Sequence, residues 1–160
     1  MPLEPLPPDG WPRYRAIRLR ALADAPEAFA STLAEETAFA AETWRARLCP
    51  GAVTLLATAG ARDVGMARGE AWHGLPGRVG LFGMWVAPEA RGKGIGKRLV
   101  LGIIAWARDE GFETLALDVA DTNAPAIALY ESCGFAPTGR TSTLPAPRAY
   151  ITEHERLLRL

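Results

Sequence analysis

The chain has 160 residues, which corresponds to one domain at roughly 100–200 residues per domain, and its 49% hydrophobic and 22% charged residues are typical of globular proteins. Its 18 lysines and arginines balance its 18 aspartates and glutamates, which excludes an overall electrostatic attraction for nucleic acid or an anionic membrane. The two cysteines, Cys49 and Cys133, belong to no CxxC motif and no Cys/His cluster, which excludes a disulfide framework and a structural zinc site.

The first residues predict a lead-in rather than a targeting segment. Five of the 13 prolines lie in the first 12 residues, so we expect an irregular segment over residues 1–12 and one domain over residues 13–160. Met1 to Pro12 lacks the basic and apolar parts of a secretory signal, and the longest apolar stretch, Leu99 to Ala107, is about half of the ~20 residues that span a membrane. We therefore expect a cytoplasmic protein with reduced cysteines, no membrane partner and no bound metal.

Two helices and three strands are predicted next. Apolar residues at helical spacing predict a helix from about Arg13 to Pro26 and a second helix over Ala34–Leu48. Strand patterns cover Ala52–Thr58, Val64–Trp72 and Val79–Ala87, and glycine, proline and aspartate residues separate them. Such short connections favour antiparallel hairpins. The third pattern is apolar on both faces, which predicts a central strand covered on both sides.

The second half of the chain predicts further helices and strands. A wide apolar stripe predicts a helix over Lys97–Glu110, and Asn123 fits the N-cap of a short helix that runs to Ser132. Pro137, Pro145 and Pro147 predict a loop. The strands expected here are Thr114–Val119, a short one that opens at Phe135, and Tyr150–Leu160 at the end.

The most informative segment is the glycine loop, Arg91-Gly92-Lys93-Gly94-Ile95-Gly96-Lys97, between a predicted strand and a predicted helix. Its three glycines allow main-chain N–H groups to form a concave anion site, and the helix start adds partial positive charge. A P-loop would need glycine at position 91 and serine or threonine at 98, and the GxGxxG pattern fails at Lys97 or Leu99. Nucleotide hydrolysis and nicotinamide binding therefore lose support. A plain helix start with a solvated basic turn is the alternative.

Two motifs, in order along the chain, resemble one known family. Arg91-x-x-Gly94-x-Gly96 is similar to the [Q/R]xxGx[G/A] loop of the GNAT superfamily of acyl-CoA-dependent N-acyltransferases. Asn123 to Phe135 is similar to the Nx₆YexxGF segment of the same family, and the resemblance covers about Arg13 to Phe135. It implies a single α+β domain whose central mixed, mostly antiparallel sheet carries helices on both faces and is splayed at the acyl-CoA site.

The resemblance implies acetyl-CoA as the acyl donor. Main-chain groups of Trp85 and Val86 are expected to bind the pantetheine arm, and Asn123, which also fits an N-cap, is a further contact. Lys93 or Arg98 is expected to reach the outer phosphate. The glycine loop is expected to bind the pyrophosphate through Arg91 and the amides of Gly92, Lys93, Gly94, Ile95, Gly96 and Lys97.

Two side chains are candidates for catalysis. By the resemblance, Tyr130 is expected to protonate the departing thiolate, and a tyrosine that only caps the core is the alternative. Asp118 lies on the opposite face of its strand from the leucines and is the candidate general base, whereas a salt-bridged or exposed aspartate is the alternative. Residues 81–86 contain no acid, unlike the same strand in some members of the family. Glu70 and water held by main-chain groups therefore remain further candidates for the base.

Together with these residues, the resemblance implies an N-acetyltransferase that moves an acetyl group from acetyl-CoA to a primary amine by direct attack in a ternary complex. The acceptor is expected to be a small-molecule or peptide amine, and the lack of a strong base favours weakly basic amines over lysine side chains. The alternative is a non-catalytic acyl-CoA-binding regulatory module on the same fold. A homodimer through the final strand is left open.

Overall fold

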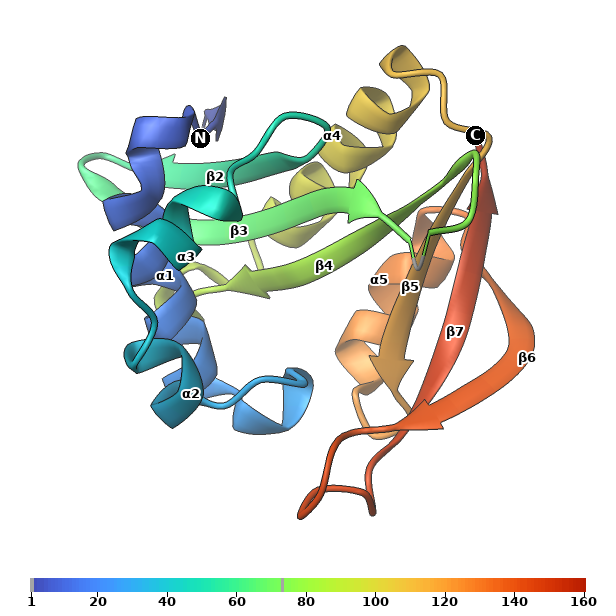
Figure 1. Ribbon diagram of the computed structural model, residues 1–160. Helices are drawn as coiled ribbons and strands as arrows, with labels where there is room; N and C mark the ends of the chain where they lie inside the picture. The colour runs from blue at the N-terminus through green and yellow to red at the C-terminus, as the bar shows by residue number, and fades with distance from the viewer. Residues whose placement is uncertain (1, 73) are drawn as a thin grey trace.

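The computed structural model describes residues 2–72 and 74–160, which form one seven-stranded sheet with five α-helices (Figure 1). The strands are β1 (Leu3–Pro5), β2 (Val53–Ala59), β3 (Arg62–Ala71), β4 (Arg78–Val86), β5 (Thr114–Ala120), β6 (Ala136–Thr143) and β7 (Thr152–Arg159). The helices are α1 (Trp11–Asp24), α2 (Leu33–Thr37), α3 (Ala41–Ala46), α4 (Ile95–Asp109) and α5 (Ala124–Ser132).

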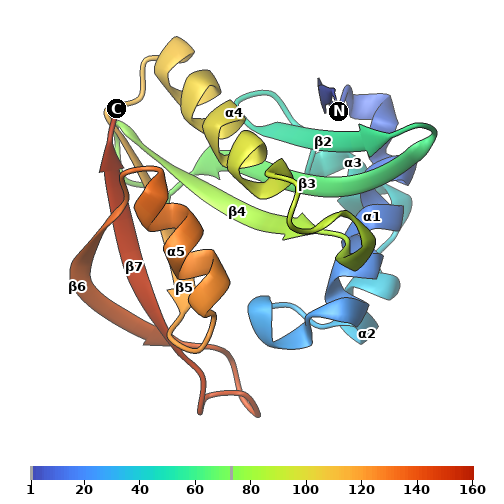
Figure 2. The ribbon, with the colours of Figure 1, turned by 180° about the vertical axis from the view of Figure 1, so that it is seen from behind.

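The sheet is mixed, with the strand order β1-β2-β3-β4-β5-β7-β6. Only the β4–β5 pair is parallel among the described strands, and the other five pairs are antiparallel. Helices α1, α2 and α3 lie on one face, and α4 and α5 cover the other face, as the view from behind shows (Figure 2). The predicted α+β fold is confirmed. Within the described residues, no helix has the length and apolar character needed to cross a membrane.

The edge strands contain prolines that the sequence placed in irregular segments. Residues Leu3–Pro5, expected in the lead-in, form β1 along the edge of β2, and Leu3 packs against the hydrophobic core. Pro137, expected in a loop, lies in β6 opposite Arg156. Because an edge strand leaves half of its N–H groups outside the ladder, it tolerates a residue that has no N–H to donate.

The helix expected over Ala34–Leu48 is two short helices. Thr32 caps α2, where its hydroxyl accepts a hydrogen bond from the Glu35 amide at 3.2 Å, and the backbone turns between α2 and α3. The turn places both Glu36 and Trp44 in the interior, fully buried. The apolar spacing indicated one continuous helix, in which Glu36 would not be selected for burial. Its carboxylate is buried because of how the two short helices pack on the rest of the fold, and not because of the local sequence pattern.

The sheet opens between β4 and β5. Their parallel register covers only three pairs, which end at Gly80 and Ala116. In β4, Gly83 and Met84 lie opposite the single residue Ala67 of β3, which is a β-bulge, and Gly83 has a left-handed φ of 61°. A bulge bends and twists its strand. The second half of β4 therefore diverges from β5, as expected for a sheet splayed at this point (Figure 1).

Candidate active site

The glycine loop leads directly into α4, whose N-cap is Gly94. Gly92 and Gly94 have φ angles of 74° and 76°, and a Cβ added at either would meet no atom within 4 Å. Glycine is therefore favoured by backbone conformation rather than by lack of space. The Arg98 amide donates to the Gly94 carbonyl at 3.1 Å, the first hydrogen bond of α4. The amides before it, including those of Ile95 and Lys97, have no carbonyl acceptor within the helix. Such a turn suits an anion.

Arg91 fastens the glycine loop to the rest of the protein. Its Nε donates to the Val86 carbonyl at 2.9 Å, and its Nη2 donates to the Asp24 carboxylate at 2.6 Å. Trp85 Nε1 donates to the same Asp24 oxygen at 3.0 Å. Asp24 thus joins the end of α1 to the end of β4 and to the glycine loop. The hydrogen bond from Trp85, followed by that from Arg91, lowers the pKa of Asp24 below its usual value.

The Asp24 contacts should stabilise the fold in a pH-dependent way. Because the folded-state pKa of Asp24 is lowered, its contribution is present above the unfolded pKa and is lost as the pH falls through the folded value. We expect Asp24→Asn to lower the free energy of unfolding by about 1 kcal/mol at pH 7 and by less near pH 3. Urea unfolding at both pH values measures this. The control is Asp109→Asn at the exposed end of α4, which should change the free energy of unfolding by at most about 0.5 kcal/mol. An equal loss for Asp24→Asn at both pH values would contradict the pH-dependent contribution of Asp24.

A cavity of about 570 Å³ lies beside the glycine loop and collects most of the cofactor candidates. Lys93 and Arg98, the two candidates for the outer phosphate, are exposed and do not line this cavity, and Lys93 Nζ lies 3.4 Å from the Glu89 carbonyl. The predicted residues that line it are Trp85, Val86, Arg91, Gly92, Gly94, Ile95, Gly96, Lys97 and Asn123. Most candidates chosen from the sequence therefore surround one cavity at the start of α4.

A second cavity, of about 610 Å³, adjoins the first at the splay and contains both catalytic candidates, Tyr130 and Asp118. The two cavities share Ala28, Phe29, Met84, Asn123 and Ala126. Met84 belongs to the β4 bulge, and the Asn123 side chain accepts a hydrogen bond from the Ala126 amide at 3.3 Å, which confirms the predicted N-cap of α5. The splay thus joins a space beside the glycine loop to a space among α1, β3 and β5.

Tyr130 is a buried phenol beside this junction. It is 6% exposed, and its ring packs edge-on against Phe135 at 5.8 Å between centroids. Burial, followed by the charge of Cys133, raises the pKa of the Tyr130 phenol above its ordinary value near 10. The hydroxyl therefore keeps its proton at neutral pH and can donate it in a hydrogen bond.

Asp118 has a carboxylate neighbour that the sequence did not reveal. Asp118 pairs with Glu155 and Ala120 with Glu153, so Asp118 and Glu153 lie on the same face of the β5–β7 pair, and both line the second cavity. Burial, followed by the charge of Asp118, raises the pKa of half-buried Glu153, and Arg148 opposes this. Glu70, the other candidate base, also lines the cavity but pairs with Arg68 at 3.2 Å.

The sequence model of the Acetyltransferase (GNAT) family matches residues 15–135, three quarters of the chain. The chain belongs to this family. A mycothiol acetyltransferase from Salinispora arenicola is 38% identical over 135 residues, which cover 80% of this chain and 41% of that protein. The chain spans less than half the length of the curated relatives it matches.

Solved structures share the fold over nearly their whole length. The ribosomal-protein-alanine N-acetyltransferase from Brucella melitensis superposes with a TM-score of 0.78 at 23% identity, covering 100% of both chains. A Salmonella typhimurium protein solved with its cofactor acetyl-CoA gives a TM-score of 0.80 at 20% identity, covering 100% of this chain and 94% of that one. These similarities support the GNAT fold of the chain.

Proposed function

We propose that the chain is an N-acetyltransferase that transfers the acetyl group of acetyl-CoA to a primary amine by direct attack in a ternary complex. The observation that carries the proposal is the junction of two cavities at the splay between β4 and β5. One cavity is bordered by the glycine loop and suits an acyl-CoA. The other contains Tyr130 and Asp118 and has room for an acceptor. Family membership and the acetyl-transfer names of the relatives support the same reaction.

The donor side fits an acyl-CoA in two respects. The left-handed Gly92 and Gly94 and the amides at the start of α4 suit a diphosphate. Beyond Gly80, the edge of β4 toward β5 has no register partner, so main-chain groups near Met84 and Trp85 are free of that ladder and suit the amides of a pantetheine arm. We assign these groups to donor binding, with the Asn123 side chain at the junction.

The chemistry assigns one proton to each catalytic residue. The neutral amine attacks the thioester carbon, a C–N bond forms, and the C–S bond breaks with its electron pair on sulfur. Tyr130 donates a proton or a hydrogen bond to this sulfur, and Asp118 accepts the proton that the amine loses. Direct attack is favoured over an acyl-cysteine because, of the residues described, neither Cys49 nor Cys133 lines either cavity.

Calorimetry with CoA and thiol release with acetyl-CoA test the proposal. We expect CoA to bind, and pantetheine, which lacks the diphosphate, to bind at least about tenfold more weakly if the glycine loop holds the diphosphate. Thiol release should depend on an added amine and yield the N-acetylated amine. Binding of CoA without turnover of any amine would instead support the non-catalytic regulatory module. Equal binding of pantetheine and CoA would remove the role of the glycine loop.

A further inference from the structure

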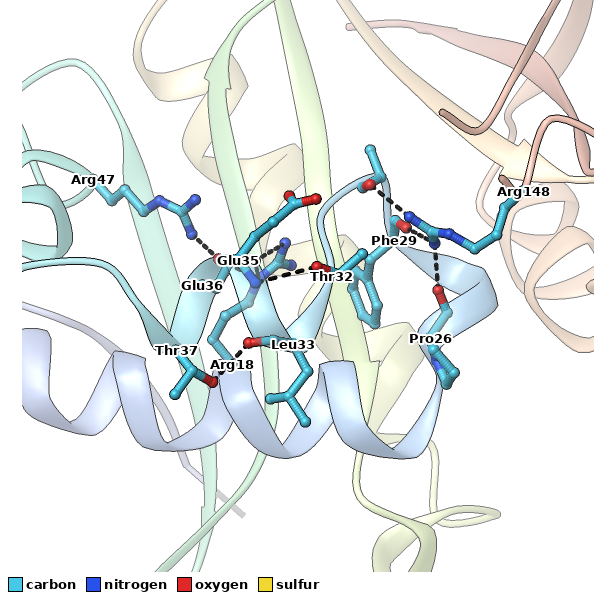
Figure 3. A network of polar contacts seen from close by, with 11 residues as sticks. Arg18, Pro26, Phe29, Thr32, Leu33, Glu35, Glu36, Thr37, Arg47 and Arg148 are labelled. Atoms are coloured by element: carbon cyan, nitrogen blue, oxygen red, sulfur yellow. Dashed lines mark hydrogen bonds and ion pairs between the residues drawn. The ribbon is translucent and has the colours of Figure 1, made fainter. Parts of the chain in front are cut away.

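One wall of the acceptor cavity is built around a buried carboxylate. Glu36 is fully buried, and Arg18 Nη2 lies 2.9 Å from one of its oxygens while Arg47 Nη1 pairs with the other (Figure 3). Arg18 and Arg47 both line the cavity, whereas Glu36 lies behind them. Two guanidinium groups share one carboxylate, so this wall has one positive charge in excess. An uncompensated, partly buried charge is unfavourable unless another group offsets it.

The excess charge lies close to the splay. A Cβ added at Gly83 in the β4 bulge would be 3.2 Å from Arg18 Nη1, so this guanidinium faces the bulge. The Arg18 guanidinium also lies over the Phe29 ring at 4.7 Å from its centroid, a favourable cation–π contact. Arg68 adds no excess charge because it pairs with Glu70. The Arg18–Glu36–Arg47 triad therefore offers a positively charged fork beside the reaction site.

The opposite wall is acidic. Asp118 and Glu153 face the cavity from neighbouring strands, and the charge of Arg148 acts on Glu153. The Arg148 guanidinium is itself committed to three main-chain carbonyls, donating to Pro26 and Phe29 at 2.6 Å each and to Ala30 at 2.8 Å (Figure 3). The cavity thus has a cationic wall and an anionic wall, and Tyr14, Phe29 and Phe82 are among the other residues that line it.

We propose that the acceptor is a small amino acid whose amino group lies at Asp118 and Glu153 and whose carboxylate binds the fork of Arg18 and Arg47. This inference rests on the proposed function. A carboxylate matches the planar donors of a guanidinium, and it supplies the negative charge that the triad lacks. A diamine or a lysine side chain without a nearby anion would place a second cation against the two arginines. The proposal includes no new covalent step.

A matched series of amines tests the acceptor class without any substitution. Thiol release is measured at saturating acetyl-CoA with 2- to 6-carbon amino acids, their carboxamides, and the corresponding alkylamines. We expect kcat/KM for at least one amino acid to exceed that of its carboxamide about tenfold or more, since the amide keeps the shape but loses the charge. Turnover in which carboxamides or alkylamines are as good as the acids would overturn the inference and leave the proposed function intact. No turnover with any amine would overturn both.

Arg47 provides the variant that isolates the charge. Arg47→Gln leaves Glu36 paired with Arg18 and removes the excess charge, so the preference for acid over carboxamide should fall to about twofold or less. Arg45→Gln is the matched control, since Arg45 is exposed in α3 two residues before Arg47, lies over Trp11 at 5.3 Å and does not line the cavity. A full acid preference in Arg47→Gln would overturn the inference. If that variant fails to fold, Glu153→Gln tests the other wall, where the amino acid KM should rise about fivefold while the acetyl-CoA KM stays unchanged.

Discussion

Tyr130→Phe is expected to lower kcat about 100-fold while it leaves the KM for acetyl-CoA within about twofold of the wild-type value. The substitution removes the hydroxyl and keeps the ring that packs against Phe135. Burial raises the pKa of this phenol, so in the wild type its hydroxyl carries a proton at neutral pH. Without it, the thiolate must leave unassisted. Rates of thiol release at varied acetyl-CoA concentrations measure both quantities.

Tyr150→Phe is the control for this prediction. Tyr150 is 73% exposed in the loop before β7 and lines neither cavity, so its hydroxyl has no expected part in transfer. A kcat for Tyr130→Phe within about threefold of wild type would exclude a proton-donating role. Tyr130 would then be the core-capping tyrosine that its 6% exposure and ring packing also fit.

The parts of the fold and site that could be predicted depend on local signals. A left-handed backbone needs glycine, so the glycine loop was visible in the sequence, and the Asn123 cap depends on a contact three residues away. Strands β2, β3, β4, β5 and β7 and helix α4 followed from apolar periodicity, with ends displaced by at most two residues, whereas β1 was not predicted and β6 is longer than the short strand expected there. The splay itself came only from the family resemblance, since no single residue pattern indicates where two strands stop pairing.

The remaining features depend on contacts between distant segments. Glu153 faces Asp118 only because of the register between β5 and β7, and a shift of one residue would turn it to the opposite face. Arg91 was expected to bind pyrophosphate, but its guanidinium bonds to Asp24, which is 67 residues away. Glu36 is buried by the turn between α2 and α3, in a segment where the apolar spacing indicated a single helix. Periodicity alone carries no information about such partners.

Glu36→Gln is expected to lower the free energy of unfolding by about 3 kcal/mol, because removal of one partner leaves charges buried without compensation. Arg18 and Arg47 keep side-chain exposures of 11% and 23%, which places the effect at the lower end for buried ion pairs. In a chain of this length, that loss corresponds to a melting temperature lower by roughly 6–12 °C. Urea unfolding and thermal melts at pH 7 measure it.

Glu35→Gln is the matched control for Glu36→Gln. Glu35 is the neighbouring residue of α2 and its side chain is exposed, so its substitution should change stability by at most about 0.5 kcal/mol. Equal effects for the two variants would show that the triad does not stabilise the fold. Glu36→Gln should lower stability but strengthen acceptor specificity, because it raises the excess positive charge of the Arg18 and Arg47 fork from one to two. Wherever the variant remains folded, its preference for amino acids over their carboxamides should therefore increase, whereas a structural lesion alone would weaken every acceptor equally.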